Sequence, residues 1–209
     1  MSALPKLNLT YTPEQYLEFE RESSERHEFW DGYLFQMAGE SLSHSRVCVN
    51  LTIEVGSKLR GSPCEALSPN MKVCTSTASL FSYPDLTIVC GEPLFHDRKK
   101  DVVVNPRVIF EVLSPSTEKY DRGKKFQRYR LGNETLTDYV LIAQEICLVE
   151  HYRKAENGSW IFENYTELTD VLRLEEIELE LVLERLYDRV ELQSVSEEED
   201  DEELFGADG

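Results

Sequence analysis

Residues 107–129, RVIFEVLSPSTEKYDRGKKFQRY, place an ionisable Glu111 inside an apolar run and a cluster of basic residues shortly after it. The segment 107–113 is rich in β-branched residues and has the length of a strand, which the turn residues at 114–117 end. The basic segment after this turn has helical composition and ends near Gly132. This order predicts a buried strand followed by a helix.

The carboxylate of Glu111 is the unusual feature of this strand. Because strand side chains alternate, Glu111 shares one face with Ile109 and Leu113. The opposite face carries only apolar side chains, those of Val108, Phe110 and Val112. A charged carboxylate in such surroundings is costly unless a cation or a metal ion meets it.

The rest of the chain alternates between helical and strand patterns. The remaining predicted elements are a helix from the N-cap Thr12 to about Ser24, a hairpin over 27–37 with its turn at Asp31 and Gly32, a helix from Ser43 to about Leu59, strands over 64–75 and 85–90, two strands within 138–153, a hairpin turn at Asn157 and Gly158, a strand over 177–183 and a closing helix over 183–190. This pattern predicts an α/β fold, with a central mixed β-sheet flanked by helices and with β-hairpins.

Composition predicts a soluble globular protein of one domain with a tail. The chain has 209 residues, of which 41% are hydrophobic, and we expect one domain over residues 1–193. Residues 194–209 contain eight acidic residues and no basic one, so they account for much of the net charge of −18. Such a block cannot bury enough apolar surface to fold, and we interpret it as a disordered, solvating tail, with a DNA mimic or a partner tether as the alternative.

Cysteine usage and hydropathy predict a cytoplasmic protein. The five cysteines are scattered singly and mostly among apolar residues, which favours reduced thiols over a disulfide framework, and no two have the spacing of a zinc-binding pair. No apolar run reaches the roughly 18 residues of a membrane span, and the N-terminus lacks the pattern of a secretion signal. We therefore expect no association with a membrane.

Two carboxylates and a lysine suit metal-assisted phosphodiester hydrolysis. Asp85 follows Pro84 at the start of a predicted strand, and Glu111 lies in another. Mg²⁺, or Mn²⁺ in its place, binds through one or two protein carboxylates, and a lysine can orient the attacking water or stabilise the added negative charge. If Asp121 caps the following helix, Lys125 lies on a helix face that can point back at the strand.

Each of these residues also has a structural interpretation. Asp85 could be a turn or capping residue, because Pro-Asp pairs are common where loops enter strands. Glu111 and Lys125 could form a buried ion pair that serves the fold alone. The basic run could be a solvated helix face. The occurrence of all three features in this order is what favours a nuclease.

The sequence resembles the Uma-type family of predicted endonucleases in the restriction-endonuclease-like superfamily. The resemblance covers about residues 9–192 and rests on these segments: YTPEQYLEFE, HEFWDGYLFQMAGE, PDLTIVC, VIFEVLSPST, DRGKKFQRY, DYVLI and LERLYDRV. It implies a sheet core flanked by helices and a site of the PD-(D/E)xK type. Leu113 stands where the superfamily pattern has lysine, and in this family a lysine of the following helix takes over.

Carried over by position, the resemblance makes Asp85 and Glu111 the metal ligands and Lys125 the catalytic lysine, with Lys124 as a second choice. Glu28 is expected to add a carboxylate to the site, or else to form a salt bridge beside the hairpin. His44 at a helix start is a candidate for the edge of the site, or else satisfies local hydrogen bonds.

The leading hypothesis is thus a Mg²⁺-dependent endonuclease acting on DNA. The basic residues expected to contact phosphates are Lys119, Arg122, Lys124 and Arg128. Tyr129 is a weaker candidate for the site, because packing with a polar tip is the favoured interpretation of this residue. The alternative is an inactive binding or assembly module that keeps the nuclease fold. A homodimer stays open, because cutting two strands benefits from two sites.

Overall fold

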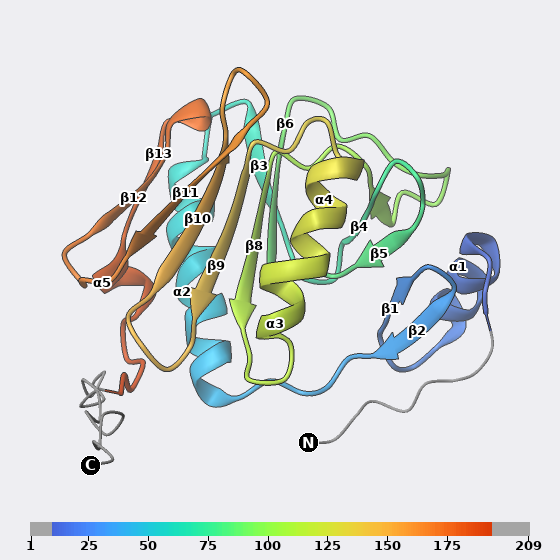
Figure 1. Ribbon diagram of the computed structural model, residues 1–209, viewed down its shortest axis with the longest axis horizontal. Helices are drawn as coiled ribbons and strands as arrows, with labels where there is room; N and C mark the ends of the chain where they lie inside the picture. Colours follow the sequence, from blue (N-terminus) through green and yellow to red (C-terminus); the bar gives the residue numbers. More distant parts are fainter. Residues whose placement is uncertain (1–9, 194–209) are drawn as a thin grey trace, which may run out of the picture.

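The computed structural model describes residues 10–193, and its centre is a mixed six-stranded sheet (Figure 1). The strand order is β11-β10-β9-β8-β6-β3, and only the pair of β8 and β9 is parallel. The bounds are β3 (Cys64–Leu67), β6 (Leu86–Cys90), β8 (Val108–Leu113), β9 (Asp138–Ala143), β10 (Val149–Lys154) and β11 (Trp160–Tyr165). The predicted mixed sheet is confirmed.

Helices cover both faces of this sheet (Figure 1). On one face, helix α2 (Leu42–Lys58) packs Val47, Leu51 and Val55 against the side chains of β8 that alternate away from Glu111. The other face meets a continuous helical segment, which consists of α3 (Glu118–Tyr120), a π-helical turn (Asp121–Lys125) and α4 (Phe126–Gly132). The predicted strand–helix unit is confirmed, and its helix lies on the face of Glu111.

A second sheet of five short strands adjoins the first. Its order is β2-β1-β5-β4-β7, with β1 (His27–Trp30), β2 (Tyr33–Gln36), β4 (Lys72–Cys74), β5 (Leu80–Ser82) and β7 (Val102–Val103). Helix α1 (Pro13–Glu22) begins with the predicted capping box, in which Thr12 and Gln15 satisfy each other's backbone N–H groups. The predicted hairpin is also confirmed, because Asp31 and Gly32 both have positive φ in the turn between β1 and β2.

The C-terminal elements complete the core on the α2 side. They are β12 (Val171–Leu174), a 3₁₀ turn (Glu175–Ile177), β13 (Leu179–Val182) and α5 (Leu183–Leu186). Strands β12 and β13 form a two-stranded sheet of their own, and their leucines join the cluster around α2. The fold class is confirmed, but the division into three sheets was not predicted. The strand predicted over 64–75 is in fact β3 and β4, which belong to different sheets.

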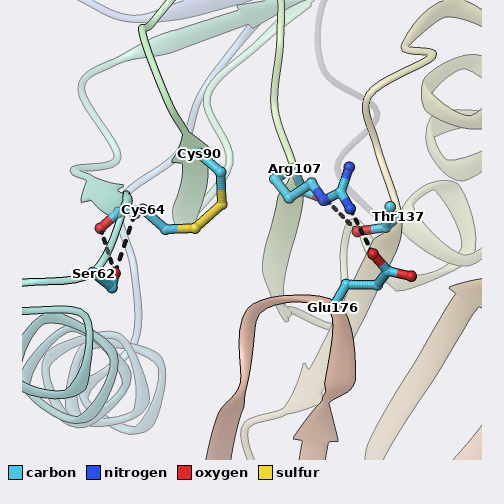
Figure 2. The surroundings of a disulfide bond; sticks show 6 residues. All are labelled: Ser62, Cys64, Cys90, Arg107, Thr137 and Glu176. Carbon is cyan, nitrogen blue, oxygen red and sulfur yellow. Dashed lines mark hydrogen bonds and ion pairs between the residues drawn. A yellow bond between two sulfur atoms is a disulfide. The ribbon is translucent and has the colours of Figure 1, made fainter.

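One disulfide corrects the expectation of reduced thiols. Cys64 and Cys90 face each other in the antiparallel pair of β3 and β6 and form a disulfide (Figure 2). The adjacent backbone bond from Gly91 N to Pro63 O makes theirs a non-hydrogen-bonded position, where opposed side chains approach most closely. Cys48, Cys74 and Cys147 are free, as predicted.

Two further expectations concern the ends of the chain and the membrane. The predicted acidic tail, residues 194–209, lies outside the described residues. Among residues 10–193 there is no helix with the length and hydrophobicity that crossing a membrane requires.

Candidate active site

The carboxylate of Glu111 is buried beneath the helical segment that follows β8. Glu111 is 4% exposed, and its Oε1 lies 2.9 Å from the Nζ atom of Lys125. This contact is an ion pair without hydrogen-bond geometry, and no group within residues 10–193 donates a hydrogen bond to Oε1. The predicted meeting of strand carboxylate and helix lysine is therefore present.

Lys125 reaches the strand because a π-helical turn ends at it. The turn spans Asp121–Lys125, and single π-turns inside helices frequently mark functional sites. Lys125 is 4% exposed, and its Nζ also lies 3.2 Å from Glu28 Oε1 and 3.4 Å from Asp121 Oδ1. Asp121 was expected to cap a helix. It instead directs its buried carboxylate at Lys125, because the turn lies within a continuous helical segment.

Glu28 comes from the other sheet. It lies in β1, and its Oε1 accepts a hydrogen bond of 3.3 Å from the backbone N–H of Tyr83, just after β5. Glu28 is 9% exposed. The hairpin and the following strand thus bring a third carboxylate to Lys125, and Lys125 joins the two sheets. This ion pair fits both interpretations of Glu28 that the sequence left open.

Asp85 lies directly before Leu86, the first residue of β6, and beside Glu111. Leu86 pairs with Phe110 in the antiparallel register, so continuing the pairing by one residue sets Asp85 opposite Glu111. Its Oδ2 accepts a hydrogen bond of 2.7 Å from the backbone N–H of Val112, which fixes the carboxylate against β8. The two carboxylates predicted as metal ligands are therefore neighbours.

Burial is the largest influence on the carboxyl groups of the site. It raises the pKa of the Glu111 carboxyl well above its usual value; Lys125 opposes this rise, while Asp121, Asp85 and Glu28 add to it. Burial also raises the pKa of Asp85. Burial alone would lower the pKa of Lys125, but the carboxylates of Glu111, Glu28 and Asp121 together raise it well above its usual value. Burial thus favours the protonated carboxyl groups, whereas the carboxylates favour the charged form of Lys125.

The same carboxylates fit a divalent cation. Glu111 and Asp85 offer hard oxygen ligands, and Mg²⁺ commonly takes one or two carboxylates while water or phosphate oxygens complete its octahedron. The Oε1 atom of Glu111, buried and without a hydrogen bond, is the kind of ligand atom such an ion would satisfy.

His44 lies beside Asp85 at the start of α2. Its Nε2 is 3.6 Å from Asp85 Oδ2, and its Nδ1 faces Glu40 Oε2 at 3.1 Å and Cys48 Sγ at 3.4 Å. This geometry fits both interpretations from the sequence, a residue at the edge of the site and a histidine that satisfies local hydrogen bonds. Burial, together with the charges of Asp85 and Glu40, raises the pKa of the Cys48 thiol.

The four basic residues expected to contact phosphates fall into two pairs. Lys119 and Lys124 are exposed and have no ion-pair partner within the part of the chain that the structure describes. Arg122 and Arg128 are engaged with acids: Arg122 binds Glu118 and Glu150, and Arg128 binds Asp31 through both of its terminal nitrogens. Only the lysines are thus free to meet a phosphate without breaking an existing contact.

Tyr129 packs in the core behind the site. It is fully buried, and its hydroxyl forms a hydrogen bond with Ser82 of β5. Burial raises its pKa well above the usual value, so it stays neutral. The packing interpretation with a polar tip describes this residue.

Some residues near the site were not found from sequence. Glu40 and Cys48 were not singled out, although Glu40, His44 and Cys48 follow each other at intervals of four and thus share one side of a helix start. The Tyr83 amide carries no side-chain signal at all, because its role depends on the pairing of β1 with β5.

The chain has a mixed α/β fold with a solved structural counterpart. It is similar to a structure described as a "putative nuclease belonging to DUF820" from Anabaena variabilis ATCC 29413, with a TM-score of 0.71 and 15% sequence identity, over 86% of this chain and 99% of that one. At this identity the similarity concerns the fold alone.

Sequence comparison then defines the family. The model of the Uma2 family, described as "Putative restriction endonuclease", matches residues 13–185, and the chain belongs to this family. Two proteins of Synechocystis sp. (strain ATCC 27184 / PCC 6803 / Kazusa) are similar along most of their length. "Uncharacterized protein slr1290" is 35% identical over 88% of this chain and 92% of its own, and "Uncharacterized protein sll1609" is 33% identical over 72% and 84%. The resemblance found from sequence motifs is confirmed.

Proposed function

We propose that this protein is a Mg²⁺-dependent endonuclease that hydrolyses phosphodiester bonds in DNA. The observation that carries the proposal is the convergence of Lys125 with Glu111 at 2.9 Å, beside Asp85. A lysine from the helix thereby reaches the region that the lysine of the superfamily pattern would reach from position 113. Membership of a family described as restriction endonucleases supports the same class of reaction.

Each side chain has a distinct role in this proposal. Asp85 and Glu111 would hold Mg²⁺, which when bound lowers the pKa of a coordinated water and neutralises phosphate charge. The raised pKa of Lys125 keeps it cationic, so it stabilises negative charge on the phosphate and is no general base. Glu28 and Asp121 hold its ammonium group in place.

Contact with DNA is assigned to the exposed lysines of the helical segment. Lys119 and Lys124 lie on the same segment as Lys125 and have no competing ion pairs within residues 10–193. Arg122 and Arg128 would contribute less, because phosphate must displace their carboxylate partners. The net charge of −18 repels a polyanion, so we expect modest affinity that falls steeply with salt.

A non-catalytic binding or assembly module is the second candidate. The direct ion pair of Glu111 with Lys125 favours it, because a pair that satisfies both groups needs no metal. Against it stands the charge imbalance, since three carboxylates lie within 3.4 Å of the single ammonium group.

Cleavage of supercoiled plasmid and of labelled single strands, with Mg²⁺ or with chelator, tests the proposal. We compare wild type with Glu111→Gln and Asp85→Asn, which keep shape but remove charge, and with Glu156→Gln, the same change at an exposed carboxylate away from the site, as a matched control. We expect Mg²⁺-dependent cutting that falls by about 10²-fold or more in the two site variants and persists in the control at low salt. If folded wild type did not cut, the binding module would be favoured. If all four proteins cut equally, the activity would come from a contaminating nuclease, and the binding module would again be favoured.

A further inference from the structure

A second set of ligand side chains lies next to the proposed magnesium site. Glu40, His44 and Cys48 each offer an atom to a common space at the start of α2, and these atoms all lie within 4.8 Å of one another. Among residues 10–193 this is the only set of three such ligands. The carboxylates around Lys125 are instead distributed around its ammonium group.

The orientation of His44 links the two sites. One ring nitrogen, Nδ1, faces Glu40 and Cys48, while Nε2 faces Asp85 at 3.6 Å. Histidines that bind metals usually donate their second N–H to a carboxylate, which fixes the tautomer and the ring orientation. Asp85 is in the position of that carboxylate, and it is itself held by the Val112 N–H at 2.7 Å.

The chemistry of the two sets of ligands selects different ions. Thiolate, imidazole and one carboxylate suit Zn²⁺ and similar borderline-soft ions, whereas Mg²⁺ requires oxygen ligands. His44 and Cys48 are half-buried and one helical turn apart, so the helix presets their spacing, while Glu40 is exposed and lies just before the N-cap Ser41. Three protein ligands leave a fourth position for water.

We propose that Glu40, His44 and Cys48 bind one divalent transition-metal ion of the zinc class, with Asp85 as the residue that positions His44. On binding, the Cys48 thiol gives its proton to the solvent and coordinates as thiolate, with no change in oxidation state. The bound ion would hold the Nε2–H of His44 on Asp85 and so connect the transition-metal site with the proposed nuclease site. Binding itself does not depend on nuclease activity.

Titration of the untagged chain with Co²⁺, without reductant and under argon, tests this site. Co²⁺ takes the same ligands as Zn²⁺ and shows thiolate-to-metal charge-transfer absorption when a cysteine binds it. We expect this absorption to saturate at one equivalent and to disappear when Zn²⁺ is added. Oxygen ligands alone, as at Asp85 and Glu111, would not produce it.

Variants locate the ligands. Cys48→Ala should abolish the absorption, and His44→Ala should weaken Co²⁺ binding by at least about 10-fold. Asp85→Asn changes the carboxylate that positions His44 and leaves Glu40, His44 and Cys48 in place, so it should weaken Co²⁺ binding by about 10- to 100-fold while the absorption at saturation is kept. Cys147→Ala is the matched control, because Cys147 is another free, half-buried cysteine, and it should bind as wild type.

Two outcomes would overturn the inference: no thiolate absorption at any Co²⁺ concentration in folded wild type, or absorption that survives Cys48→Ala. Glu111→Gln separates this inference from the proposed function. That variant should lose cleavage but keep Co²⁺ absorption, so failure of either proposal can be seen without the other.

Discussion

Two buried clusters of polar side chains lie on opposite faces of the same sheet and differ in how many carboxylates meet each basic residue. On the face beneath α3 and α4, one lysine, Lys125, meets three carboxylates. On the face toward α2, His151 Nε2 lies 2.7 Å from Asp138 Oδ1, and both side chains are completely buried. Paired residues of neighbouring strands share a face of the sheet, and faces alternate along each strand. Asp138 pairs with Val108, whose side chain lies on the face opposite that of Glu111, so the two clusters are separated by the sheet.

The number of carboxylates for each basic residue, more than burial itself, distinguishes a candidate site from a structural pair. Asp138 and His151 form a one-to-one pair between neighbouring strands, and its two remaining polar atoms have no hydrogen-bond partner in the described chain. Such a pair suits a fixed structural role. The Lys125 cluster keeps an uncompensated negative charge, which is unfavourable in the protein alone and becomes favourable when a cation binds.

The largest expected effect on stability is that of Lys125→Met. Removing the ammonium group leaves the carboxylates of Glu28, Glu111 and Asp121 buried together, so we expect a loss of about 3–5 kcal/mol in the free energy of unfolding. Urea denaturation measures it. Lys124→Met is the control, because Lys124 is exposed, and should stay within about 0.5 kcal/mol of wild type. Equal stability of the two variants would contradict a central role for Lys125.

On the α2 face of the sheet, His151→Leu should lower the free energy of unfolding by about 3 kcal/mol, because it leaves Asp138 buried without a partner. The double variant His151→Leu, Asp138→Val should recover most of this loss, since a balanced structural pair can be replaced by apolar side chains. A double-mutant cycle by urea denaturation checks both values. A double variant as unstable as the single one would show that the pair does more than satisfy its own charges.

Unlike Lys125→Met and His151→Leu, Glu111→Gln should stabilise the metal-free protein by about 1 kcal/mol, as removal of an unfavourable functional charge often does. The pKa of Glu111 is raised in the folded state, so the folded protein binds this proton more tightly than the unfolded chain. The contribution of Glu111 to wild-type stability therefore falls as pH rises above the unfolded pKa of about 4.3, and the advantage of the variant grows.

Urea denaturation in chelator at pH 5 and pH 8 measures this difference. Asp138→Asn is the matched control on the other face, and it should destabilise the protein because it weakens a balanced pair. A Glu111→Gln variant that is less stable than wild type at both values of pH would show that Glu111 stabilises the fold, as Asp138 does.

The smallest expected effect concerns the surface beside the site. Lys124→Ala should reduce the slope of log Kobs for DNA binding against log salt concentration by about 0.9, the value of one phosphate contact on duplex DNA. Arg128→Ala should change it less, because Asp31 already binds Arg128. Fluorescence anisotropy with a short duplex at several salt concentrations measures both. The reverse order of the two variants would contradict the assignment of the free lysines to DNA.

Local patterns were sufficient to predict the unit that carries the site. The alternation around Glu111 determines its face, and the helical periodicity of the following segment places Lys125 on the side that points back at the strand. The contact of Asp121 with Lys125 was not predicted. The hairpin turn at Asp31 and Gly32 was predictable because positive φ there favours these residue types.

Features that depend on pairing between distant strands were not predicted. The disulfide joins Cys64 and Cys90, which are 26 residues apart, and only the register of β3 against β6 sets them opposite each other. Strand β5 and the separation of β3 from β4 carry weak local signals, because strands of three or four residues show little alternation. The approach of Glu28 to Lys125 likewise depends on how the two sheets meet.

The most direct test of the charge imbalance is whether Mg²⁺ stabilises the protein through Glu111. Thermal or urea unfolding is measured at increasing Mg²⁺ for wild type, Glu111→Gln and Cys48→Ala, which alters only the α2 ligands. We predict that wild type and Cys48→Ala gain stability with Mg²⁺, by about 2.7 kcal/mol at 100 times the Kd, and that Glu111→Gln gains none. Wild type that does not respond to Mg²⁺, or Glu111→Gln that responds equally, would contradict the account.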